Sequence, residues 1–191
     1  MKTALRLTLA LLFCITLLVG VHSSAFAETV DSGSWGDFNW TLNDTGALTI
    51  SGTGSAGGFS SNSTSAYLAY RDSIKTVVIK NGITAIGDYA FTRCNKIEEI
   101  SVPASVTAIG FNAFEYCSSL SKITIPAEEV SIKNAAFLGC SSIKSAGPIG
   151  TGCDYEFGWT TSIPSYAFYS CSNLQAIDIP NGITSIGERA F

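Results

Sequence analysis

The sequence AFTRC at residues 90–94 returns three times, as AFEYC at 113–117, AFLGC at 136–140 and AFYSC at 167–171. The phenylalanine recurs after 23, 23, 31 and 23 residues, and the cysteine keeps the first three of these spacings. The residues concerned are Phe91, Phe114, Phe137, Phe168 and Phe191, with Cys94, Cys117, Cys140 and Cys171. Self-similarity at a fixed short period is the signature of stacked structural repeats. The sequence therefore predicts a solenoid in which these side chains lie in register.

Each repeat contains a short strand. In LSKITIP at residues 120–126, Ile123 and Ile125 alternate with polar residues, as on the buried face of a strand. Pro126 follows and is expected to end the strand, because proline has no N–H for a strand ladder. Pro103 and Pro180 occupy the equivalent positions.

The second half of each repeat has a different period. In IGFNAFEYCSSL at residues 109–120, Ile109, Ala113 and Cys117 follow one another at helical spacing. We expect a short helical turn here, on the side of the coil opposite the strand. A period of 23 residues lies within the range of roughly 20–29 residues of leucine-rich repeats. The predicted fold class is an α/β solenoid with a parallel concave sheet and short convex helical turns.

The repeated cysteines have three interpretations. We favour buried thiols that pack like small apolar side chains, because each lies between an aromatic and an aliphatic position. Stacked strands lie about 4.8 Å apart, which permits a disulfide, but equivalent side chains point the same way rather than toward each other. A metal site has the least support, because the chain has no C-x-x-C pair. Disulfides, including one to Cys153, remain the alternative.

The fourth repeat contains eight extra residues within GPIGTGCDYEFGWTTSIPS, residues 147–165. Ala146 and Pro148 replace two aliphatic residues of the strand, so a weak strand is expected there. The insert is predicted to be a loop. It either contacts a ligand or folds its aromatic side chains onto the solenoid, and the second interpretation is favoured. The candidate residues of this loop are Tyr155, Glu156, Phe157 and Trp159.

The segment before the repeats is predicted to be an N-terminal cap made of a β-hairpin and a helix. Strands are expected at residues 38–42 and 47–51, joined by the turn-forming sequence NDTG. The helix is expected near Tyr67, Tyr70 and Ile74, which share a helical face. Solenoids need such an end element because their terminal coils would otherwise expose apolar groups. A sugar-stacking surface made of Trp35 and Trp40 is a minor alternative.

The first residues indicate export. Lys2 and Arg6 precede an apolar run over residues 7–21, which is shorter than the roughly 20 residues of a membrane-spanning helix. The sequence Ala25-Phe26-Ala27 then has the form of a signal-peptidase site, so cleavage is expected after Ala27. A retained membrane anchor and a lipid-modified Cys14 are the alternatives. The predicted location is therefore extracellular, either secreted or at the cell surface.

Composition excludes several functions. Removal of residues 1–27 leaves 164 residues and changes the net charge from −4 to −6. No basic run is present, so nucleic acid is not an expected partner. The single histidine, His22, is lost with the leader, which excludes catalytic and metal sites that require imidazole. We expect neither an enzyme nor a cofactor.

The expected boundaries follow the repeat. The chain also stops at Phe191, three residues before the next cysteine position, so we expect the last repeat to be truncated. The predicted segments are a signal peptide at 1–27, a cap at 28–73 and repeats at 74–96, 97–119, 120–142, 143–173 and 174–191.

The IGxxAFxxC units and the tryptophan-containing cap resemble the BspA-like family of bacterial surface leucine-rich repeat proteins. The resemblance extends from about Trp35 to Phe191, although Val130 stands one place later in its repeat than Val106 does. That shift is expected to affect only a local loop. The resemblance implies a curved right-handed solenoid and, for some members, adhesion to matrix proteins or other cells. It implies no catalytic residues.

Two functions fit these observations. The first is a binding module whose outward strand residues contact an extracellular protein or a surface glycan. The second is a structural spacer without a ligand of its own. The candidate contact positions on the predicted concave sheet are Thr76, Val78, Glu99, Ser101, Lys122, Thr124, Ala176 and Asp178.

Overall fold

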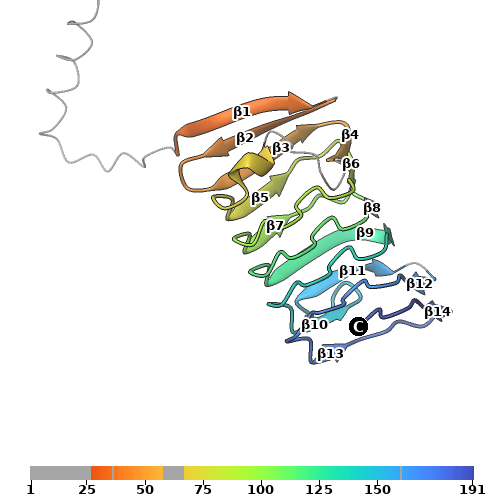
Figure 1. Cartoon of the computed structure of the whole chain (residues 1–191). Coiled ribbons are helices and arrows are strands. Elements are labelled where there is room, and N and C mark those ends of the chain that lie inside the picture. The colour runs from red at the N-terminus through yellow and green to blue at the C-terminus, as the bar shows by residue number, and fades with distance from the viewer. Residues whose placement is uncertain (1–26, 36, 58–66, 160) are drawn as a thin grey trace, which may run out of the picture.

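The computed structural model describes residues 27–35, 37–57, 67–159 and 161–191 of the chain (Figure 1). The predicted leader therefore lies outside the described residues, apart from Ala27. The strands are β1 Thr29–Trp35, β2 Phe38–Asn43, β3 Ala47–Gly52, β4 Gly54–Ala56, β5 Thr76–Ile79, β6 Ile83–Ile86, β7 Glu99–Ser101, β8 Ala108–Ile109, β9 Lys122–Ile132, β10 Ser145–Gly147, β11 Tyr155–Trp159, β12 Ser162–Ile163, β13 Ala176–Ile177 and β14 Ser185–Ile186. A 3-10 helix, η1, spans Tyr67–Tyr70.

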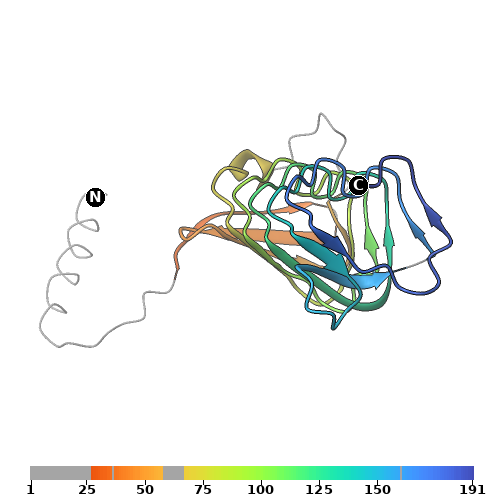
Figure 2. The same cartoon turned by 90° about the horizontal axis from the view of Figure 1, so that it is seen from below.

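The coils have three sides, which Figure 2 shows along the stack. The first side, here called the main row, is the strand series β1-β2-β3-β5-β7-β9-β11-β10-β13. The second row consists of β4, β6, β8 and the end of β9, followed by the separate pair β12 and β14. The third side, here called the turn ridge, consists of turns in the described repeats, such as those of residues 87–96, and of η1 in the first coil. From β5 to β13 the strands of the main row pair parallel, as the predicted parallel repeat sheet requires.

Strand register follows the repeat in the main row. Ile100 of β7 is paired with Ile123 of β9, and both side chains are buried. The neighbouring residues on each strand point outward, because successive side chains of a strand face opposite sides. β7 ends before Pro103 and β13 ends before Pro180, as proline at a strand end predicts.

The helical turns expected on the third side are absent among the described repeats. Tyr89 and Arg93 have positive φ angles of 58° and 59°, which interrupt a right-handed helix. The amide of Phe91 donates to the carbonyl of Ala113 in the next coil at 2.8 Å, not to a residue four positions back. Successive turns also place an apolar residue inward every three or four positions. The helical prediction was wrong because this spacing is shared by helices and stacked turns.

A column of aromatic rings fills the interior beneath the turn ridge. Phe91 and Phe114 have ring centroids 5.5 Å apart, and Phe114 and Phe137 are 5.4 Å apart with an interplanar angle of 1°. Phe168 continues the column at 5.5 Å from Phe137. Tyr67 of η1 occupies the equivalent place in the first coil, 6.1 Å from Phe91. Each coil therefore covers the ring of its neighbour.

The ladder cysteines are free thiols and are buried. The Cys117 thiol donates to the carbonyl oxygen of Phe91, 26 residues earlier, at 3.1 Å, and Cys140 donates to Phe114 O at the same distance. Cys171 donates to Phe137 O at 3.2 Å. The thiols thus link successive coils while they fill core volume. Burial holds the pKa of Cys117 well above its usual value, so it stays protonated.

The insert of the fourth repeat is only partly the predicted loop: residues 148–154 are irregular, but residues 155–159 form the strand β11. Tyr155 packs onto the solenoid, as the favoured interpretation expected. β11 pairs with β9 on one side and with β10 on the other, and all three strands are parallel (Figure 1). Tyr155 is buried at its start, and its hydroxyl donates to Leu120 O at 3.2 Å. Its ring lies 5.0 Å from that of Phe137. The insert therefore adds a strand to the main row and an aromatic ring to the core.

β9 does not end at Pro126, contrary to the sequence prediction. It continues to Ile132 and belongs to both strand rows. Its pairing with β11 changes register between Phe157 and Trp159, opposite Ile125 and Val130. The one-residue shift at Val130 is thus accommodated by a strand irregularity next to β11, not by a loop.

The cap is more extensive than the predicted hairpin. β2 and β3 pair antiparallel, with Trp40 opposite Ile50, and β1 adds a third antiparallel strand that the sequence analysis missed. η1 is a single 3-10 turn rather than an α-helix. The Trp40 side chain is only 2% exposed and packs 6.1 Å from Tyr67, so it is unavailable for sugar stacking. The side chain of Trp35 lies outside the description.

Candidate binding surface

The predicted contact positions lie on the outer face of the main row, in two lines that cross the strands. Thr76, Glu99 and Lys122 are register partners in the first line. The second line joins Val78, Ser101 and Thr124 in the same way. Strand pairing therefore turns positions 23 residues apart in sequence into neighbours on one face.

The insert separates the remaining two candidates from this group. β11 enters between β9 and β10, so Ala176 and Asp178 on and beside β13 lie one strand further from β9 than the repeat implied. Glu156 of β11 is the register partner of Thr124 and continues the second line. Its carboxylate also accepts a hydrogen bond from Gly152 N at 2.6 Å. Glu156 thus reaches the candidate face from a strand rather than from a loop.

The other insert candidates are placed differently. Tyr155 faces the core and cannot contact a ligand. Phe157 and Trp159 belong to β11, but their side chains lie outside the description. Cys153, within the insert region and before β11, is a half-buried free thiol.

A shallow depression of about 280 Å³ lies over β7 and β9. It is lined by Glu99, Ile100, Ser101, Val102, Lys122, Ile123, Thr124 and Pro126. Glu99 and Lys122 supply opposite charges directly across the strands, while Ser101 and Thr124 are small. Such a surface suits hydrogen bonding to a broad ligand better than it suits the enclosure of a small molecule.

A larger groove of about 660 Å³ lies at the far edge of the inserted strand. Its lining comes from the irregular part of β9, from β11 and from the segments after β10 and β13. The residues are Pro126, Glu128, Glu129, Pro148, Ile149, Gly158, Thr161, Pro180, Asn181 and Gly182. The sequence analysis missed it because the groove depends on β11 entering the sheet.

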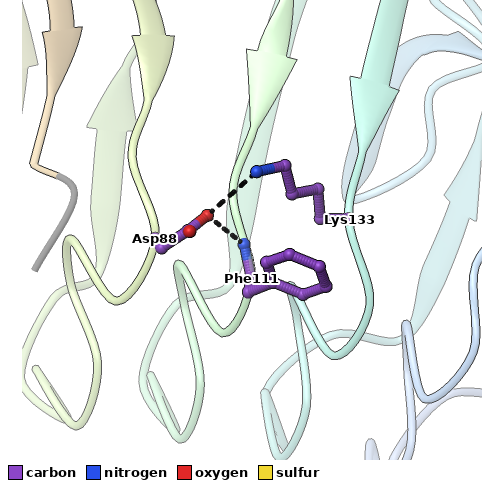
Figure 3. Close-up of polar contacts among 3 residues, drawn as sticks. All are labelled: Asp88, Phe111 and Lys133. Atoms are coloured by element: carbon purple, nitrogen blue, oxygen red, sulfur yellow. Dashed lines mark hydrogen bonds and ion pairs between the residues drawn. The ribbon is translucent and has the colours of Figure 1, made fainter. Parts of the chain in front are cut away.

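A polar cluster just after the ends of β6, β8 and β9, where the second row meets the turn ridge, joins three coils (Figure 3). An oxygen of the Asp88 carboxylate accepts from Phe111 N at 2.8 Å and from Lys133 Nζ at 3.4 Å. Lys133 Nζ also lies 4.8 Å from the centre of the Phe111 ring. Both charged side chains are substantially exposed, so the ion pair contributes little to stability. This cluster therefore links three successive coils at their surface.

Within the described ranges, no three His, Cys, Asp or Glu side chains gather in a way that could hold a metal ion. The described part of the chain also contains no helix that is long and apolar enough to cross a membrane. The two surfaces considered for ligand contact are the outer face of the main row and the groove beside β11.

These features define the class of protein as a leucine-rich repeat solenoid, a fold typically used for binding rather than catalysis. The chain belongs to the BspA-type leucine-rich repeat family, because residues 62–148 and 159–191 match the BspA type leucine rich repeat region in 6 copies. The family resemblance seen in the sequence is thus confirmed.

Solved structures agree with this assignment. The chain is similar to a leucine-rich repeat protein from Eubacterium ventriosum, with 27% identity and a TM-score of 0.64 over 82% of this chain and 40% of that chain. A leucine rich cell surface protein from Faecalibacterium prausnitzii shares 24% identity and a TM-score of 0.58 over 84% of this chain and 46% of that one. This chain therefore spans less than half the length of either protein. No curated protein matches the sequence.

Proposed function

We propose that this protein is a secreted or cell-surface binding module that adheres to an extracellular protein or a surface glycan. The observation that carries the proposal is the register of the main row, which gathers outward side chains from successive repeats on one face. Thr76, Glu99 and Lys122 form one line of that face. Stacked repeats use such extended surfaces for binding.

We also propose export, on the basis of the leader sequence expected at residues 1–27. A leader at residues 1–27 would be removed, leaving the cap at 28–73 and the repeats at 74–191. Detection of a secreted chain that begins at Glu28, by mass spectrometry of the culture medium, would support this organisation. A chain that retains residues 1–27 in the cell would contradict it.

The binding face can be tested with two matched substitutions. Ser101→Arg places a large side chain at the centre of the main-row face, whereas Thr84→Arg places one on the second row, where Thr84 is also exposed. Immobilised protein is incubated with purified matrix proteins and a glycan array. We expect the wild type and Thr84→Arg to retain a ligand that Ser101→Arg loses.

The outcomes separate the candidate functions. Equal retention by both variants would place the ligand elsewhere on the molecule. The absence of any retained protein or glycan would favour the structural spacer, which shares the same core and lacks a ligand.

A further inference from the structure

The groove beside β11 exists because β10 ends before β11 does, so the sheet loses one strand there. β10 ends at Gly147, which pairs with Glu156, whereas β11 continues to Trp159 along β9. The segment 157–159 therefore has a strand neighbour on the β9 side but lies past the end of β10 (Figure 1). The groove crosses this point and has an open form that suits an extended chain.

Gly158 of β11 forms part of the floor of the groove. A β-carbon at this position would overlap the carbonyl oxygens of Glu128 and Ala127, so only glycine allows the irregular part of β9 to approach β11 so closely. Gly158 is buried, and it leaves no side chain to fill the groove above the strand. The depression is thus built into the strand pairing.

The walls combine apolar surface with negative charge. Pro126, Pro148 and Pro180 contribute proline rings, and Ile149 is 42% exposed beside them. Glu128 and Glu129 are both exposed and supply two carboxylates. The groove lining, as far as the structure describes it, contains no Lys or Arg.

The charged groups of the lining favour partners that donate hydrogen bonds, although Thr161 and Asn181 can also donate. The three prolines have no N–H, and the side chain of an ionised glutamate has hydrogen-bond acceptors but no donor. An anionic ligand would meet like charges, whereas ammonium or guanidinium groups would meet carboxylates. Apolar groups beside those cations would cover Ile149 and the proline rings.

We propose that this groove binds an extended, basic segment of another protein, in which Lys or Arg alternates with aliphatic residues. The cations contact Glu128 and Glu129, while the aliphatic residues lie on Ile149 and the prolines. The groove and the depression over β7 and β9 have only Pro126 in common, so peptide binding and the main-row function are separable by substitution.

The probe is a fluorescein-labelled peptide of five Lys-Val repeats, titrated with the full-length protein and followed by fluorescence anisotropy. A peptide of five Glu-Val repeats is the charge control. We expect saturable binding of the lysine peptide alone, with an affinity that falls as salt increases because the charges are exposed.

Two pairs of variants locate the site. E128Q with E129Q is expected to weaken binding about tenfold, through loss of two exposed charge contacts. D72N with E98Q removes the same charge from exposed positions outside the groove and should leave binding unchanged. I149K should abolish binding, whereas V30K, at a residue 56% exposed in the cap, should not.

The proposal is overturned if both glutamate and control pairs weaken binding equally, since attraction to the net negative charge would then suffice. It is also overturned if neither peptide binds, or if a chitosan oligomer binds through Glu128 and Glu129 while the lysine peptide does not. A ligand lost with Ser101→Arg but kept with E128Q and E129Q would leave the main-row function standing after such a failure.

Discussion

Replacement of Phe114 by alanine tests the interior column directly. Phe114 is fully buried, and its ring stacks on Phe91 at 5.5 Å and on Phe137 at 5.4 Å. The Phe91 ring lies in the preceding coil and the Phe137 ring in the following one. The substitution therefore weakens two inter-coil contacts and leaves a cavity between them.

The expected loss is about 3–5 kcal/mol, as for other buried phenylalanines. Stacking raises the loss within this range, because each aromatic pair contributes about 0.5–1.5 kcal/mol beyond its buried area. Two pairs are lost here, so the result should lie toward the upper end. Stability in repeat proteins depends on contacts between neighbouring coils, which makes a central position costly.

Phe191→Ala is the matched control. Among the described rings, Phe191 stacks on Phe168 alone, at 6.0 Å, and it is 46% exposed. We expect a loss of about 1–2 kcal/mol, in proportion to the smaller buried area. Urea unfolding followed by circular dichroism gives both values. A loss below about 1 kcal/mol for Phe114→Ala, or equal losses for the two variants, would refute the stacked column.

Four further outcomes are expected. Burial raises the pKa of the Cys94 and Cys171 thiols to about 12 in the folded protein, so these thiols ionise at lower pH in the unfolded chain. The free energy of unfolding should therefore fall by about 1 kcal/mol per thiol between pH 8.5 and 9.5. Urea unfolding curves that show no such decrease would contradict this. Tyr155→Phe should cost about 1–2 kcal/mol by the same assay, because Leu120 O loses a buried donor. Cys117→Ala should cost only about 1–2 kcal/mol and leave the circular dichroism spectrum unchanged, whereas thiol titration of the denatured wild type should detect free thiols. Asp88→Asn should change the unfolding free energy by less than about 1 kcal/mol, since its ion pair with a lysine is exposed, and a larger loss would show that the cluster is more than a surface link.

The sequence predicted the repeat and its core positions because each coil must present the same side chains to its neighbours. Phe91 and Phe114 needed only their 23-residue spacing to be placed one above the other. The spacing was insufficient for local conformation on the turn ridge. There Tyr89 and Arg93 adopt positive φ angles, and the backbone amides of their coil form hydrogen bonds with carbonyl groups of the next coil instead of forming a helix.

The inserted strand shows a different limit. Residues 155–159 have strand-forming side chains, but composition does not say which neighbours will pair with them. β11 lies between β9 and β10, and in this position the Tyr155 ring packs against the Phe137 ring. That pairing moved Asp178 one strand further from Thr124 and produced the groove at Gly158.

The sequence by itself determined that this chain is a leucine-rich repeat solenoid with an interior of aromatic rings and thiols. It could do so because a period repeated along the chain records the one environment that all coils share. Only the tertiary structure decided the order of the strands, the extended course of β9 and the shape of the outer surface. Those features depend on hydrogen bonds between segments distant in the chain, for which the repeat period carries no information.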